Sequence, residues 1–161
     1  MKETEINQFG ELKIEKLLMN NGESCEIFLP ENNRDRIAFA NEYCDFKPVG
    51  FARFDFGWMP ITYKVVTEKL ESLGLRKNPN PLHFPVGEWV FEQNTLQYGD
   101  KDFGGIWSAH RLGNANTIKK YCLEEKGMAT RCFLTAVYSP VAFVGNYRIK
   151  SEGVMLMKEV S

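Results

Sequence analysis

The chain has 161 residues, of which 43% are hydrophobic and 25% charged, and its formal net charge at pH 7 is −1. This length is typical of one folded domain, and the composition excludes an intrinsically disordered protein. The 20 basic and 21 acidic residues are spread along the chain. Because nonspecific nucleic-acid binding needs a strongly basic face, we do not expect nucleic acid as a partner.

The N-terminal part is predicted to form two strands followed by a helix. Residues 12–16 alternate between apolar and charged side chains, residues 20–22 (NNG) supply a turn, and residues 25–29 continue in an extended conformation. Asn32 or Asn33 can then cap the start of a helix.

Residues 49–58 alternate with a period of two and carry apolar side chains on both faces, which predicts a strand in the interior of a sheet. A second helix is expected to begin at Thr62 and to end at Gly74, with a buried stripe of Val66, Leu70 and Leu73. Residues 76–85 contain three prolines and two asparagines, so they form either a long loop or a weak boundary between two halves of the chain.

The second half is predicted to contain more strands than helices. Strands are expected at residues 88–92, 104–109, 131–138, 147–149 and 154–159, and a third helix at residues 116–126, ended by Gly127. This order favours an α+β fold: a single domain over residues 1–161, with a mostly antiparallel or mixed sheet packed against about three helices.

The sequence carries no pattern typical of a metal site or of an exported protein. Its four cysteines, Cys25, Cys44, Cys122 and Cys132, contain no C-x-x-C pair, and only two histidines are present. The first ten residues are polar and acidic, unlike a signal peptide, and no apolar run is long enough to cross a bilayer. We therefore expect no metal, no cofactor, no membrane contact, four reduced thiols and a cytoplasmic location.

The loop at residues 108–117 is the strongest candidate for an anion site. It joins a strand to a predicted helix that begins near Asn116, so free N–H groups and the helix dipole would meet a ligand there. Arg111 can pair with a phosphate or carboxylate, and His110 can exchange a proton. Asn114 and Asn116 are equally good helix caps, so the same loop also fits a purely structural role.

From Gly104 to Val160 the predicted order is strand, helix, strand, loop, strand, which resembles the second half of ADP-ribosyltransferase-type domains. The resemblance places His83 at the family's nicotinamide-side histidine and Trp107 at its aromatic tyrosine. Phe84 and Pro85 replace the glycine and threonine that follow that histidine in the family, and Asn146 lies near the position of the catalytic glutamate. The resemblance therefore implies a non-catalytic relative.

No nucleophile with a base and no cofactor fingerprint is recognisable, so no catalytic residue is assigned. The first hypothesis is a small soluble binding or protein-interaction domain, such as a bacterial or phage accessory protein, which contacts another protein through an aromatic-rich surface. The alternative is a nucleotide-binding or degenerate ADP-ribosyltransferase-like domain. It would bind a small anionic ligand through His83, Trp107, His110, Arg111, Asn114 and Asn116.

Overall fold

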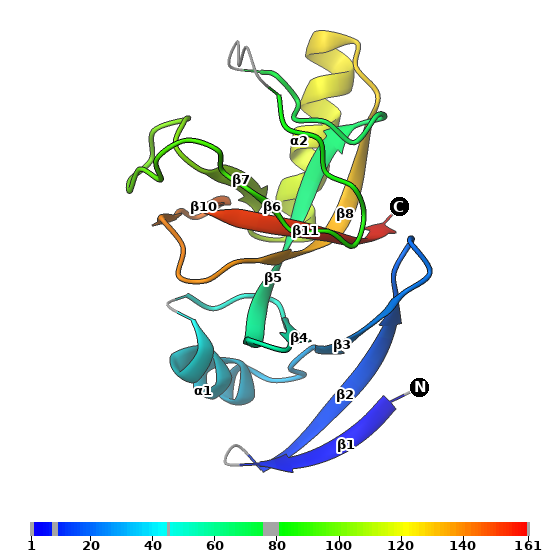
Figure 1. The fold of residues 1–161 in the computed structure, drawn as a ribbon, viewed down its shortest axis with the longest axis vertical. Coiled ribbons are helices and arrows are strands. Elements are labelled where there is room, and N and C mark those ends of the chain that lie inside the picture. The colour runs from blue at the N-terminus through cyan, green and yellow to red at the C-terminus, as the bar shows by residue number, and fades with distance from the viewer. Residues whose placement is uncertain (1, 8–9, 45, 76–80, 161) are drawn as a thin grey trace.

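The computed structural model describes residues 2–7, 10–44, 46–75 and 81–160, and these residues are mostly β-sheet (Figure 1). The first half contains β1 (Lys2–Asn7), β2 (Gly10–Leu18), β3 (Ser24–Phe28), α1 (Asn33–Tyr43), β4 (Phe51–Phe54) and β5 (Gly57–Thr67). The second half contains β6 (Val90–Phe91), β7 (Ile106–Ala109), α2 (Leu112–Lys126), β8 (Thr130–Val137), β9 (Phe143–Val144), β10 (Arg148–Ser151) and β11 (Gly153–Val160).

The eleven described strands join into one sheet, and every strand pair in it is antiparallel. The prediction of a sheet packed against about three helices is wrong, because the described residues form only two helices and the sheet dominates. The strands β1 to β4 follow one another in order and lead into the first residues of β5.

Helix α1 covers this first part of the sheet. Its N-cap is Asn32, as predicted, whose side-chain oxygen accepts a hydrogen bond of 2.8 Å from the Asp35 N–H. Its buried residue Phe39 packs on Phe28 of β3 and on Phe51 of β4, with ring centroids 5.0 and 4.6 Å apart. The buried ring of Phe39 thus attaches the helix to the sheet.

Strand β5 connects the two halves of the molecule (Figure 1). Residues 57–60 pair with β4, whereas residues 61–67 pair with β8. The predicted strand 49–58 is interior, as expected, but it ends at Phe54, where a tight turn leads into β5.

The helix predicted from Thr62 to Gly74 is wrong, since residues 62–67 belong to β5. Five of the seven residues from 61 to 67 are β-branched, which favours a strand, and hydrogen bonding on both sides of the strand decides the matter. Leu70 lies in a turn with φ of 61°, a conformation that no α-helix contains.

On one side of β5 lie β8, β11 and β6, and on the other side lie β7, β10 and β9. Because β7 and β8 both run antiparallel to β5, α2 between them is a crossover, and it packs on β5, β7 and β8. The main core lies on the opposite face of this sheet and includes Val66, Phe84 and Phe133. Among the described residues, no helix is both long and apolar enough to span a membrane.

Candidate functional site

A cavity of about 720 Å³ opens beside β5 and β7. The two strands share one residue pair, Tyr63 with Ala109, and beside it the Thr62 hydroxyl donates a 2.9 Å hydrogen bond to the Ser108 hydroxyl oxygen. Lys64 and Val65 of β5, the whole of β7 and the loop that precedes it line the cavity, together with residues 72–75, Leu82, Phe84, residues 92–94, Ile118 of α2 and Arg148 of β10. The cavity is therefore bounded by residues from several parts of the chain that are far apart in the sequence.

Lys64 is the buried charge of this cavity, with only 8% of its surface exposed. Its Nζ donates a 2.6 Å hydrogen bond to the Trp107 carbonyl oxygen on β7. It also lies 5.0 Å from the ring centroid of Phe84, a favourable cation–π distance. Burial lowers the pKa of the Lys64 ammonium from 10.5 to about 8. In the described part of the chain, no carboxylate lies within ion-pair distance of it.

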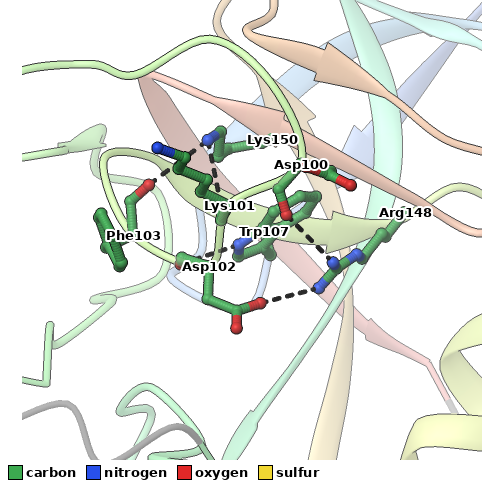
Figure 2. Close-up of polar contacts among 7 residues, drawn as sticks. All are labelled: Asp100, Lys101, Asp102, Phe103, Trp107, Arg148 and Lys150. Carbon is green, nitrogen blue, oxygen red and sulfur yellow. Dashed lines mark hydrogen bonds and ion pairs between the residues drawn. The ribbon is translucent and has the colours of Figure 1, made fainter.

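Trp107 forms an aromatic wall of the cavity and is held in place on several sides (Figure 2). Its indole N–H donates to the Asp102 carbonyl oxygen at 3.0 Å. The Arg148 guanidinium lies 3.8 Å from the ring centroid, and one of its nitrogens is 3.5 Å from the Asp102 carboxylate. Arg148 thus stacks on the indole ring, and its guanidinium pairs with the carboxylate of Asp102, the residue whose carbonyl oxygen accepts the indole N–H.

Lys150 ties the same loop to β10 from within the protein. Its side chain is fully buried, and its Nζ donates to the carbonyl oxygens of Lys101 and Phe103 at 3.1 and 3.4 Å (Figure 2). Burial lowers the pKa of the Lys150 ammonium, and the charge of Asp100 partly offsets this shift. The loop that forms one side of the cavity is therefore held by two cations, Arg148 and Lys150.

Of the six residues singled out from the sequence, Trp107 alone is part of the cavity wall. His83 is exposed and pairs with Glu71 in an isolated bridge, and it does not line the cavity although its neighbours Leu82 and Phe84 do. His110 follows β7, and its ring packs against Phe46 at 5.8 Å. Burial lowers the His110 pKa, with further lowering by the charges of Arg111 and Arg36, and its Nδ1 is buried without a hydrogen-bond partner in the described residues.

The helix start expected near Asn116 lies four residues earlier, because α2 begins at Leu112. Arg111 is the exposed N-cap and makes no side-chain capping hydrogen bond, while Asn114 and Asn116 lie inside the helix. The N–H groups of an anion site at Asn116 are therefore not free there, since a helix leaves only its first turn unpaired.

Lys64, the central charge of the cavity, was not among the residues predicted from the sequence. The reason is that the segment from Thr62 to Gly74 was predicted to form a helix, whose buried stripe of Val66, Leu70 and Leu73 did not include Lys64. One signal was present: Lys64 is the one charged residue in the apolar, β-branched run from Ile61 to Thr67. Because α2 covers one face of β5 and the main core covers the other, a charge on this strand becomes buried.

The described residues contain no group of three or more His, Cys, Asp or Glu side chains that could hold a metal ion. No protein-family model, no curated protein and no solved structure matches the chain at the significance we required. The geometry of the molecule itself is therefore the basis for any functional proposal.

Proposed function

We propose that this chain is a small-molecule-binding protein whose cavity between β5 and β7 takes an organic anion with a ring-shaped apolar body. The observation that carries the proposal is the buried ammonium of Lys64 in the wall of a 720 Å³ cavity, without a carboxylate partner in the described residues.

An anion is the kind of ligand that would neutralise the buried charge of Lys64. A buried ammonium costs free energy unless a counter-charge and acceptors satisfy it, and Lys64 has one main-chain acceptor for its three N–H donors. A ligand carboxylate beside Nζ would supply both the charge and the missing acceptors. Arg148 also lines the cavity, where its guanidinium is 3.5 Å from the Asp102 carboxylate, and Asp102 and Glu92 are the acidic residues of the lining.

The remaining lining favours an apolar, planar body for this anion. Trp107, Phe84 and Phe103 contribute aromatic surface, and Leu73, Leu82 and Ile118 contribute aliphatic surface. The volume lies within the range of about 300–1,000 Å³ that is common for small-molecule sites. Such a ligand matches the binding role expected from the sequence, with a small anion in the place of a partner protein.

The test compares two probes of the same shape, 2-naphthoate and its neutral analogue 2-naphthamide, by isothermal titration calorimetry. The wild type is expected to prefer the carboxylate. Lys64→Met should weaken 2-naphthoate binding about tenfold to a hundredfold, because a charge-assisted hydrogen bond is lost, and should leave 2-naphthamide binding nearly unchanged. Lys120→Met, which removes an exposed lysine of α2, is the control and should behave as the wild type.

The pH dependence adds an independent readout. Because only the protonated amine attracts a carboxylate, wild-type affinity for 2-naphthoate should fall as the pH rises above the Lys64 pKa. The proposal fails if neither probe binds at millimolar concentration, or if Lys64→Met binds 2-naphthoate as tightly as the wild type does.

A further inference from the structure

Five aromatic side chains gather on a surface that is separate from the cavity. They come from the end of β4 and the turn that follows it, from β6 and the residue before it, and from the residue after β8. We call them the aromatic surface cluster: Phe54, Phe56, Trp89, Phe91 and Tyr138. We infer that this cluster binds a cationic segment of a partner protein, with a lysine or arginine side chain over its rings.

The rings form one continuous group. Phe54 and Phe56 stack with centroids 5.4 Å apart, and Trp89 contacts both of them at 5.1 and 5.8 Å. Tyr138 lies 5.4 Å from Phe91 and 5.8 Å from Phe56, which closes the group. Three segments that are far apart in the sequence thus present a single aromatic surface.

The cluster has a buried base and an open top. Phe54 and Trp89 are partly buried against core residues such as Ala52 and Met155. By contrast, 54% of Phe56 and 43% of Phe91 are exposed. Exposed phenylalanines that sit next to one another on a rigid base are typical of a recognition surface.

The backbone beneath Phe91 is shaped for close approach of the ring. A Cβ atom at Gly153 would lie 2.5 Å from a ring carbon of Phe91, so a larger residue there would displace the ring. Gly153 pairs with Phe91, and its carbonyl accepts the Tyr138 N–H at 2.9 Å. The placement of two cluster rings therefore depends on the glycine between them.

The charge around the cluster selects the partner. The exposed carboxylates Asp55, Glu88 and Glu152 flank Phe56, Trp89 and the Gly153 turn in the sequence. None of the three forms an ion pair with a described residue. Arg53, the nearby cation in the sequence, has its guanidinium over Trp58, which is outside the cluster. The cluster therefore combines aromatic rings with exposed carboxylates that are adjacent in the sequence to Phe56, to Trp89 or to Gly153.

A cation satisfies both properties at once, since the face of an aromatic ring and a carboxylate each attract positive charge. Elsewhere in the described structure four rings already carry a lysine or arginine: Trp58, Phe84, Trp107 and Phe133. No described lysine or arginine lies over a ring of the cluster. A second copy of the chain is a poor occupant, because a symmetric contact would bring two acidic patches together.

The probe is hexaarginine, with hexaglutamate as its charge-reversed counterpart, titrated by calorimetry at 150 mM salt. We expect hexaarginine to bind the wild type and to lose about tenfold in affinity with Phe56→Leu/Phe91→Leu, which keeps apolar volume but removes the rings. Asp55→Asn should weaken hexaarginine binding severalfold, and it should not make the affinity more dependent on the salt concentration. Tyr98→Ala/Tyr147→Ala, which removes two exposed tyrosines outside the cluster, should bind as the wild type does.

Three results would overturn the inference. The first is failure of hexaarginine to bind the wild type at millimolar concentration. The second is equal binding by Phe56→Leu/Phe91→Leu, whose folding is checked by its circular dichroism. The third is a dimer in sedimentation that these leucine substitutions dissolve, since the occupant would then be a second copy. None of these results depends on whether the cavity binds 2-naphthoate, so the two proposals fail separately.

Discussion

At the scale of single residues, Lys64 shows how a strand can force a charge into the interior. Thr62, Lys64 and Val66 alternate along β5 with Tyr63 and Val65, which face α2. The lysine therefore has to enter the opposite layer, where Val66 and Phe84 form part of the core. Replacing a buried, unpaired charge by an apolar side chain of similar length is often stabilising, and we expect Lys64→Met to fold.

The lowered pKa of Lys64 predicts how stability changes with pH. The folded-state pKa is about 8, below the 10.5 of the unfolded chain, so the folded protein releases this proton first. The free energy of unfolding should therefore rise as the pH increases from 7 through 8.5, by on the order of 1 kcal/mol or less. Urea unfolding at a series of pH values measures it, and Lys64→Met should show a smaller rise, to which Lys150, whose pKa burial also lowers, still contributes.

Two thiols limit the useful pH window of this experiment. Burial raises the pKa of Cys25 and of Cys132 from 9.0 to about 11, so the folded state keeps these protons longer. Their contribution lowers stability as the pH rises through 9, opposite to that of Lys64. A wild-type profile that is flat or falling between pH 7 and 8.5 would contradict the assignment of a buried ammonium to Lys64.

At the scale of elements, the residue that caps the end of α2 contributes more to its stability than the residue that caps its start. Its N-cap Arg111 makes no capping hydrogen bond, whereas Gly127 ends the helix with φ of 60° and donates its N–H to the carbonyls of Cys122 and Leu123. This left-handed conformation is the one that glycine adopts without strain.

Two glycine substitutions in α2 should therefore have opposite effects. Gly127→Ala should destabilise the protein by about 1 kcal/mol, because alanine is strained at positive φ. Gly113→Ala should stabilise it by roughly 0.5–1 kcal/mol, since Gly113 lies within the helix and an added Cβ meets no atom within 4 Å. Urea unfolding of the two variants gives both values, and effects of the same sign would contradict this account of the helix end.

At the scale of the whole molecule, β5 connects the two halves by pairing with β4 at its start and with β8 along the rest of its length. A core cluster crosses the boundary, since Ile27 and Ala52 of the first half pack with Ala136 and Met155 of the second, and Ile61 of β5 lies fully buried among them. Phe84, from the segment that the sequence marked as a possible boundary, is buried in the main core. Residues 76–80 of that segment lie outside the described residues.

This shared core predicts a single cooperative unfolding transition. Hydrogen exchange followed by mass spectrometry in increasing urea should show peptides from β3–β4 and from β8–β11 losing protection together. Ile61→Ala should lower the stability of both by the same amount, about 2–5 kcal/mol, because it leaves a cavity in their common core. Leu18→Ala, at an exposed position, should have little effect. Separate transitions for the two sets of peptides would show two independent units.

The features that the sequence by itself determined are those that depend on neighbouring residues. The turn after β2, the Asn32 cap, the stop at Gly127 and the strand at residues 131–138 all follow from short-range backbone preferences and alternation. Tertiary structure alone decided the rest, because the decisive contacts join distant residues. Strand pairing on both sides made residues 62–67 a strand instead of a helix, and this placed Lys64 beside Trp107. The aromatic surface cluster likewise exists because the sheet brings residues 54, 91 and 138 together, a contact for which no local pattern codes.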